Sequence, residues 1–258
     1  MKIFNIDNIK KSLSNIVDVP FNHCVIDNFF TQRVATKLCQ SFPKYNSNIY
    51  HVYKNKLEDK KTCNNWNEFD PLTYDVFRQL NSDYFIKLIR DIAKVKLISD
   101  PGLHGGGWHI HTNKGELNPH LDYSIHPKTQ LQRRINLIIY LEDRYKTKYG
   151  GYLGFWEHDK SQKQPGKLIK EIYPKFNRAV IFDTSQNSWH GLSRKIQLPK
   201  SVYRKSIAVY YLCIPNKKHL TNTRALFAPR KNQKNIKEIK DLIKTRSDKD
   251  VFYKAYKE

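Results

Sequence analysis

Hydrophobic residues in the first part of the chain have the spacing of α-helices. Val34, Leu38 and Phe42 lie four positions apart, so they fall on one face of a helix. This pattern predicts a helix over residues 32–42, and Pro43 ends it because proline cannot continue a helix. This segment can therefore form a helix that buries an apolar stripe against a core.

Two more helices are expected before the pattern changes. Asp70 is followed directly by a proline, which is typical of a helix start, because aspartate caps free backbone N–H groups and proline fits the first turn. The spacing then predicts helices near 71–80 and 83–95. Residues 21–30 fit a short strand, whereas residues 44–69 are polar and are expected to be irregular.

After residue 100 the spacing becomes that of β-strands. Apolar residues alternate or run continuously over short stretches, and turn-like stretches separate them. Several short strands arranged in this way are typical of a β-sandwich or barrel. Helical spacing returns after residue 216, most clearly at Ile236, Ile239, Leu242 and Ile243. The predicted strands cover residues 108–112, 134–142, 152–157, 178–183 and 204–214.

This pattern divides the chain into three parts. Residues 1–100 are predicted to hold a strand and helices that pack on a core, and residues 101–215 to form the β core. Residues 216–258 are predicted to form a basic helical C-terminal extension. The expected fold class is therefore mainly β with flanking helices.

The net charge adds an interpretation for the C-terminal extension. The chain carries 46 Lys and Arg against 24 Asp and Glu, a net charge of +22, and its 39% of hydrophobic residues exclude a wholly disordered chain. Residues 216–258 alone carry a net charge of +8. Two interpretations stay open: a solvated lysine-rich surface, or a segment that attracts an acidic partner such as nucleic acid. The surplus is spread along the chain, which differs from a focused nucleic-acid-binding stripe.

The sequence predicts a cytoplasmic protein without a membrane span. No apolar run approaches the roughly 18 residues that a transmembrane helix needs. The N-terminus lacks the apolar stretch of a signal peptide, so export is not expected. The four cysteines are scattered without a C-x-x-C pair, which suits a reducing compartment.

A histidine stands two positions before a carboxylate at His120 and Asp122. In an extended segment residues i and i+2 face the same side, so both side chains can bind one cation. His190, which follows an apolar strand and a polar turn, is the best source of a third ligand. Two histidines and one carboxylate form the facial triad of non-haem Fe(II) oxygenases, which leaves coordination positions open. The alternative is a surface histidine beside a solvated aspartate.

A second chemical feature is an arginine in a predicted core strand. Arg204 and Ser206 share one face of the strand over residues 204–214. A guanidinium that faces into a β core needs an anionic partner, and it can hold a carboxylate through two hydrogen bonds. The alternative is an edge-strand arginine that faces water.

Another pair of histidines, His109 and His111, also shares one face of a predicted strand. The pair could form a second metal site, but no matching acidic ligand stands close to it in the sequence. We therefore interpret both as strand histidines near the mouth of a pocket.

Seven segments occur in the order of a known family. They are residues 25–30, 120–122, 133–141, 150–156, 176–182, 188–191 and 204–206. With these gaps the chain resembles the Fe(II)/2-oxoglutarate-dependent dioxygenases, in the prolyl 4-hydroxylase-like branch, over about residues 20–215. The nucleic-acid demethylase branch carries a second arginine six residues after the first. This position is Tyr210 here, which argues against that branch.

The resemblance implies a double-stranded β-helix core, a jelly roll of the cupin-like kind, within residues 101–215. It implies that His120, Asp122 and His190 bind Fe(II) and form the catalytic centre. The implied cofactors are Fe(II), the co-substrate 2-oxoglutarate and O₂, and ascorbate is left open as an additional reductant.

The resemblance also implies a binding site for the co-substrate. Arg204 matches the residue that binds the distal carboxylate of 2-oxoglutarate, and Ser206 completes the Arg-x-Ser pattern. Tyr140 matches a tyrosine that hydrogen-bonds the same carboxylate in related prolyl hydroxylases. Strand alternation places Tyr140 on the same face as Asn136 and Ile138, which is consistent with this role.

The implied activity is hydroxylation of a C–H bond, with release of succinate and CO₂. A prolyl residue in a peptide or protein is the first expected substrate, from the branch resemblance only. A free amino acid, a sugar or a lipid precursor is the alternative. A non-catalytic jelly-roll module and a nucleic-acid-binding protein without activity are the rivals. A jelly-roll protein that has lost this activity would usually lack His120, Asp122, His190 or Arg204, and all four are present here.

Overall fold

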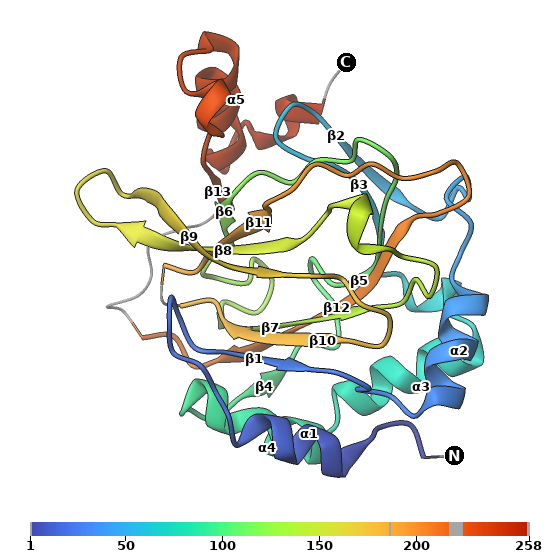
Figure 1. The fold of residues 1–258 in the computed structure, drawn as a ribbon. Helices are drawn as coiled ribbons and strands as arrows, with labels where there is room; N and C mark the ends of the chain where they lie inside the picture. The colour runs from blue at the N-terminus through green and yellow to red at the C-terminus, as the bar shows by residue number, and fades with distance from the viewer. Residues whose placement is uncertain (1, 186, 217–223, 257–258) are drawn as a thin grey trace.

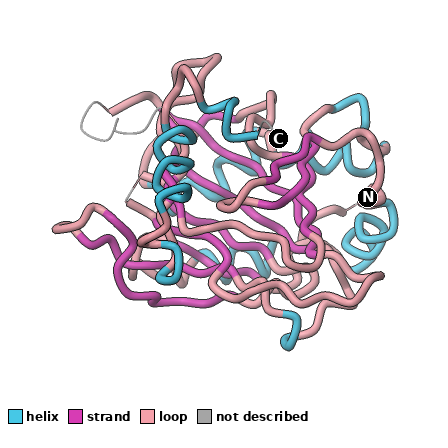
Figure 2. The backbone as a smooth tube through the Cα atoms, turned by 90° about the horizontal axis from the view of Figure 1, so that it is seen from above, coloured by secondary structure: helices cyan, strands magenta, loops and turns pink. Residues whose placement is uncertain are grey.

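Two antiparallel β-sheets that face each other form the centre of the molecule (Figures 1 and 2). The computed structural model describes residues 2–185, 187–216 and 224–256. The larger sheet has eight strands and the smaller has five. Side chains from both sheets, including Tyr140, Phe155 and Phe182, pack together between them. The prediction of a mainly β fold is therefore confirmed.

The larger sheet has the strand order β1-β10-β7-β12-β5-β3-β2, and β4 pairs with the C-terminal end of β12. Its strands are β1 (His23–Ile26), β2 (His51–Lys54), β3 (Asp59–Cys63), β4 (Ile98–Ser99), β5 (Gly107–His111), β7 (Gln132–Tyr140), β10 (Ala179–Asp183) and β12 (Arg204–Cys213). The smaller sheet has the order β13-β6-β11-β8-β9. Its strands are β6 (His120–Leu121), β8 (Leu153–Asp159), β9 (Gln164–Ile172), β11 (Trp189–Leu192) and β13 (Leu226–Phe227).

Four helices cover the outer face of the larger sheet (Figure 1). They are α1 (Ile6–Leu13), α2 (Gln32–Ser41), α3 (Pro71–Leu80) and α4 (Asp83–Ala93). Asp70 caps α3, because its carboxylate accepts hydrogen bonds from the N–H groups of Leu72 at 3.0 Å and Thr73 at 3.2 Å. The helices predicted over 32–42, 71–80 and 83–95 are thus confirmed within one or two residues.

Strand alternation divides each central strand into an apolar side and a polar side. In β12, Ile207, Val209 and Tyr211 pack with the helices in the main hydrophobic cluster. Arg204 and Ser206 alternate with these residues and therefore point between the two sheets. β7 and β5 repeat the arrangement, so the space between the sheets receives polar side chains from three neighbouring strands.

The expectation that residues 44–69 are irregular is wrong. This stretch contains the hairpin of β2 and β3, which extends the larger sheet through the pairing of β3 with β5. The hairpin, residues 51–63, carries four lysines and lacks an apolar alternation. The sheet edge on which it pairs stabilises it, so its own sequence gives little strand signal.

Helix α1, the strand β9 and the short strand β13 were also not expected from the pattern. In addition, the strand predicted over residues 21–30 is shorter, because β1 covers only His23–Ile26.

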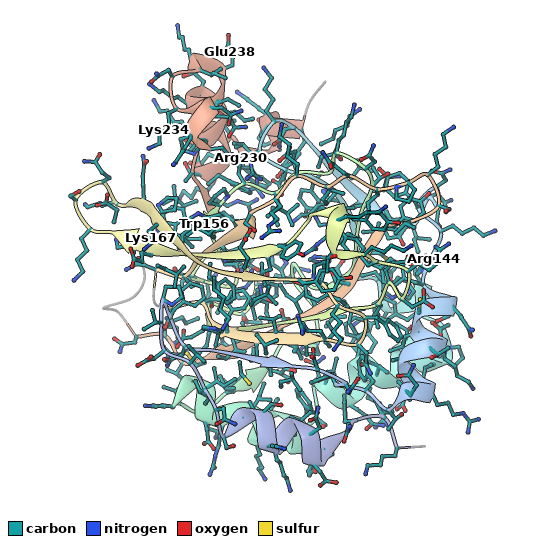
Figure 3. All side chains as sticks on the ribbon, in the orientation of Figure 1. Arg144, Trp156, Lys167, Arg230, Lys234 and Glu238 are labelled. Carbon is teal, nitrogen blue, oxygen red and sulfur yellow. The ribbon has the colours of Figure 1, made fainter. Side chains whose placement is uncertain are left out.

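The C-terminal segment, defined here as residues 224–256, packs on the smaller sheet. It contains β13, η4 (Lys231–Gln233), α5 (Lys237–Ser247) and η5 (Phe252–Tyr256), and β13 pairs with β6. Figure 3 shows Arg230 where this segment meets the core. The Arg230 guanidinium donates hydrogen bonds to the side chain of Asn118 at 3.0 Å and to the Leu192 carbonyl at 2.9 Å. The helix predicted from the isoleucine spacing is confirmed as α5.

The described residues contain no helix with both the length and the hydrophobicity that crossing a bilayer requires.

The packing of α5 can be tested with two isoleucines of the same helix region. Ile239 is 1% exposed and packs with Leu57 and Phe227, whereas Ile236 is 39% exposed. Ile239→Ala should lower the free energy of unfolding by roughly 2–4 kcal/mol, because it leaves a cavity in a buried cluster. Ile236→Ala should cost less than about 1 kcal/mol. Urea unfolding measures both values, and equal losses would contradict this packing.

Candidate metal centre

The register of the smaller sheet places two histidines side by side. His120 on β6 is the direct partner of His190 on β11, and their ring centroids lie 4.2 Å apart. Asp122 follows two residues after His120, so its carboxylate reaches the same face. Each histidine Nε2 lies 3.8 Å from a carboxylate oxygen of Asp122. The structure therefore brings together the three residues predicted as metal ligands, with their donor atoms within 4.8 Å of one another.

Backbone carbonyls orient both imidazoles. The Nδ1 of His120 lies 3.0 Å from the Asn118 carbonyl, and the Nδ1 of His190 lies 2.9 Å from the Ser188 carbonyl. A neutral ring can donate from Nδ1 to such a carbonyl, and its Nε2 lone pair is then directed at the centre of the group. This is the arrangement in which a histidine binds a metal ion.

The protonation states also suit a cation. Burial lowers the pKa of His120 to about 3 and also lowers the pKa of His190. Burial alone would raise the pKa of Asp122, but nearby His190 and Arg133 hold it below its ordinary value. Two neutral imidazoles and one carboxylate can bind a divalent cation at neutral pH without first losing protons.

Two side chains that the sequence analysis did not assign to the site hold the Asp122 carboxylate. The Asn136 side-chain amide donates to it at 3.5 Å, and the Arg133 guanidinium lies 3.8 Å away. Arg133 is 3% exposed and lies between the rings of Tyr123 and Tyr210, at 3.7 and 3.4 Å from the ring centroids. A buried arginine at the start of a core strand is the sequence signal that could have indicated this role.

Arg204 faces the space between the sheets and is 5% exposed. Its Nε donates to the Gly151 carbonyl at 2.8 Å, and its Nη2 donates to the Tyr140 hydroxyl at 3.2 Å. Among the described residues no carboxylate forms an ion pair with this guanidinium, so its buried positive charge is not balanced by an anion of the protein. Ser206 lies opposite Tyr140 in the strand register, on the same face.

Gly151 must be glycine for this arrangement. Its φ angle is +61°, and a Cβ atom there would lie 2.5 Å from the Tyr145 hydroxyl and 3.2 Å from Arg204 Cδ. The turn therefore brings a backbone carbonyl close enough to orient the guanidinium.

The side chains of His109 and His111 point between the two sheets. The prediction that both lie near the mouth of a pocket is confirmed for His109 only. His109 lines a cavity beside the metal centre. His111 pairs with Arg204 in the strand register, is 2% exposed, and has no hydrogen-bond partner at either ring nitrogen. Burial lowers the pKa of both side chains, so they are neutral. Neither histidine belongs to a metal-binding group within the described part of the chain.

The cavity beside the metal centre has a volume of about 330 Å³. Its walls come from β2, β3, the glycine stretch before β5, the metal centre and the C-terminal segment. The ring of Phe227, from β13, stacks on His120 with a centroid distance of 5.0 Å. The C-terminal segment therefore forms part of the site as well as part of the fold.

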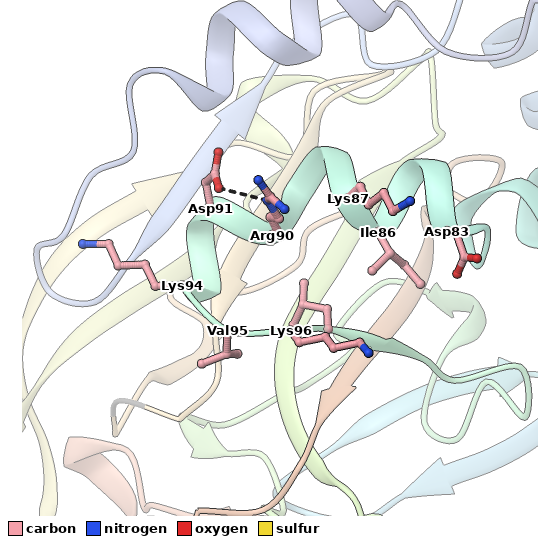
Figure 4. Close-up of a pocket in the computed structure, with 9 residues that line it drawn as sticks. Asp83, Ile86, Lys87, Arg90, Asp91, Lys94, Val95 and Lys96 are labelled. Atoms are coloured by element: carbon pink, nitrogen blue, oxygen red, sulfur yellow. Dashed lines mark ion pairs between the residues drawn. The ribbon is translucent and has the colours of Figure 1, made fainter.

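A separate hollow lies on the surface of α4 and the residues after it (Figure 4). Its charged groups are exposed, as in the pair of Arg90 and Asp91, whose side chains are 68% and 81% exposed. It lies on the helix side of the larger sheet, and no residue of the metal centre lines it.

Comparison with known proteins shows what the core of the chain is similar to. The model of the 2OG-Fe(II) oxygenase superfamily matches residues 107–212, the stretch from β5 to β12 that contains the metal centre and Arg204. The fold is similar to a prolyl-4-hydroxylase from Pseudomonas putida, with 11% identity, a TM-score of 0.57, and coverage of 81% of this chain and 100% of that chain.

Two further solved structures agree on the fold. A prolyl 4-hydroxylase from Phytophthora capsici has 14% identity and a TM-score of 0.58, with 97% of this chain and 80% of that chain covered. HygX from Streptomyces hygroscopicus, with nickel and 2-oxoglutarate bound, has 11% identity and a TM-score of 0.51, with 74% and 82% covered. The predicted double-stranded β-helix core is confirmed.

The ligand assignment predicts a selective loss of metal binding. His190→Ala should weaken Fe(II) binding by at least about 100-fold, because one of three donors is removed. His51→Ala is the control, since His51 is an exposed residue of the cavity wall and no part of the metal centre. Anaerobic equilibrium dialysis measures both affinities. Similar Fe(II) affinities for the two variants would contradict the assignment.

The buried histidines predict acid destabilisation of the metal-free protein. His109 and His120 have a pKa of about 3 through burial, against 6.5 in the unfolded chain. Between these values the unfolded state binds more protons, so stability is full above pH 6.5 and falls as the pH is lowered. The expected loss is roughly 1.4 kcal/mol per histidine for each pH unit below 6.5. Urea unfolding in chelator measures it, and constant stability from about pH 7 to about pH 5 would contradict it.

Proposed function

We propose that this protein is an Fe(II)- and 2-oxoglutarate-dependent dioxygenase that hydroxylates a C–H bond, because the model of the 2OG-Fe(II) oxygenase superfamily matches residues 107–212. One observation carries the proposal. A metal-ligand group on the smaller sheet stands in the same inter-sheet space as Arg204, a buried arginine of the larger sheet with no described carboxylate partner. A resident metal and an anionic co-substrate together account for both features.

His120, Asp122 and His190 would hold Fe(II), which suits two imidazoles and one carboxylate with open positions. When bound, Fe(II) supplies the activation of O₂ that couples conversion of 2-oxoglutarate into succinate and CO₂ to hydroxylation. Asn136 and Arg133 keep the Asp122 carboxylate in place and ionised. The rings of Phe182 and Phe227 pack on the two histidines and exclude water from them.

Arg204, Tyr140 and Ser206 would bind the far carboxylate of 2-oxoglutarate. Arg204 is already oriented by Gly151 and Tyr140, so little side-chain freedom is lost when an anion binds. Burial raises the pKa of Tyr140, so its hydroxyl keeps a proton that it can donate to a carboxylate. His111 stays neutral beside Arg204 and adds unpartnered ring nitrogens to this end of the site.

The first substrate hypothesis is a prolyl residue in a peptide or protein. The similarity of the fold to two prolyl hydroxylases supports it. The alternative, a small molecule, is favoured by the way the C-terminal segment narrows the cavity. Tyr256 contacts Tyr53 of β2 at 5.4 Å between ring centroids, and Gln233 donates to the Lys56 carbonyl at 3.2 Å. These contacts tie the β2–β3 hairpin to the C-terminal segment over the site.

Three expectations stay predictions: a cytoplasmic location, ascorbate as an additional reductant, and an acidic or nucleic-acid partner for residues 216–258. For the last of these, Arg230 and Arg246 contribute less free charge than the sequence indicates, because their guanidinium groups make hydrogen bonds and ion pairs within the protein.

The co-substrate assignment predicts a separation of two affinities. Arg204→Ala should weaken 2-oxoglutarate binding by at least about 100-fold, because charge-assisted hydrogen bonds are lost, while Fe(II) affinity stays within about threefold. Anaerobic calorimetry measures Fe(II) binding to the metal-free protein and 2-oxoglutarate binding to the Fe(II)-loaded protein. Arg194→Ala is the matched control, since Arg194 pairs with Glu171 at the surface and is 52% exposed. Equal 2-oxoglutarate affinity in the two variants would place the carboxylate site elsewhere.

A further inference from the structure

The cavity beside the metal centre carries more positive charge than its carboxylates balance. Its lining includes the cations Lys60, Arg224 and Arg246 on the side of the β2–β3 hairpin and the C-terminal segment. On this side the only described carboxylate in the lining is Glu58, so three cations share one anion. The fourth cation, Arg133, lies against Asp122 and is already balanced.

Glu58 is fully engaged by its neighbours. It is 1% exposed, and its carboxylate pairs with Arg246 at 2.9 Å and Lys60 at 3.7 Å and accepts a hydrogen bond from Tyr256. One carboxylate cannot neutralise both cations and also Arg224. Arg246 is only 7% exposed, and its Nη1 is buried without a hydrogen-bond partner.

Arg224 has no ion pair with any carboxylate in the described ranges. Its guanidinium stacks on the Phe252 ring at 3.5 Å, and its Nε is buried without a hydrogen-bond partner. Burial and then the nearby Arg246 lower the pKa of Arg224, which reports the uncompensated charge at this wall. An unpaired guanidinium such as that of Arg224 in a partly buried wall is costly unless an anion binds there.

We propose that this wall binds an anionic oxygen group, a carboxylate or a phosphate, of a small-molecule substrate. Arg224, Arg246 and Lys60 hold the group, and the rest of the substrate extends along the cavity to the metal centre. The anion site rests on Arg224, which has no ion pair among the described residues, and on the excess of three cations over Glu58, whereas its role in placing a substrate C–H bond rests on the proposed function. A guanidinium pair is suited to a planar or tetrahedral oxyanion, because it offers several donors in a fixed geometry.

The size of the cavity and its C-terminal wall favour a small molecule over an extended peptide. A volume of about 330 Å³ is at the lower end of ordinary small-molecule sites. The C-terminal segment forms one wall of this partly open cavity, and Arg246 and Tyr256 fix the wall by binding Glu58, which directly precedes β3. A polypeptide that crossed this wall would have to displace these buried contacts.

The first experiment measures binding of inorganic phosphate and of acetate to the metal-free protein by calorimetry, at constant ionic strength. Arg224→Gln should lower the affinity for whichever of the two anions binds more tightly by about tenfold, because charge-assisted hydrogen bonds are lost. Arg90→Gln removes the same charge from the exposed hollow of Figure 4 and should leave the affinity unchanged. Arg204→Ala should also leave it unchanged, which separates this site from the co-substrate site.

The outcomes decide between this wall and other sites. Tighter binding of phosphate or of acetate identifies the class of the anionic group. Equal affinities in wild type and Arg224→Gln, or no binding of either anion, would overturn the proposal. Loss of binding only in Arg204→Ala would show that the anion occupies the co-substrate site, which leaves the proposed function intact and removes this inference.

The second experiment measures succinate release with two kinds of added compound. Pools of small carboxylic and phosphorylated compounds should stimulate it in wild type, and Arg224→Gln should raise the KM far more than it lowers kcat. A neutral prolyl peptide should not stimulate it. Stimulation by the peptide and by none of the acidic compounds would contradict the proposed substrate class.

Discussion

The antiparallel register between β6 and β11 is the constraint on which the site depends. It sets His120 directly opposite His190, and residue alternation brings Asp122 to the same face. A shift of one residue in either strand would turn one imidazole away from the centre. The carbonyls of Asn118 and Ser188 then fix both rings, each accepting from the histidine two residues on. The fold thus orients the donor atoms of the site in the absence of a bound cation.

The larger sheet supplies the second half of the site by the same alternation. Each of β5, β7 and β12 presents apolar residues to the helices and polar residues to the space between the sheets. The interior therefore contains His111, Tyr140 and Arg204 in contact with one another or in direct register. Buried polar groups without internal partners are costly in a protein that binds nothing. Their presence here is the physical reason to regard the inter-sheet space as a binding site.

The sequence allowed much of this to be predicted, because the relevant signals are local. The i, i+2 spacing of His120 and Asp122 and the position of Arg204 in an apolar strand follow directly from strand geometry. Arg133 at the start of a core strand gave a signal of a polar role, but its contact with Asp122 and that of Asn136 could not be predicted, since both depend on which strand lies beside the ligand strand. The β2–β3 hairpin was missed because the sheet edge, and not an apolar alternation, stabilises it. The basic C-terminal helix was found, but its place in the cavity wall depends on long-range pairing with β6.

One spectrum tests the central claim most directly, namely that Fe(II) and 2-oxoglutarate meet between the two sheets. The wild-type protein, titrated anaerobically with Fe(II) and 2-oxoglutarate, should develop a weak visible charge-transfer band that requires both components. Chelation of the co-substrate to the metal produces this band, so neither component alone should give it. A protein that binds both components at saturation and shows no band would contradict the account.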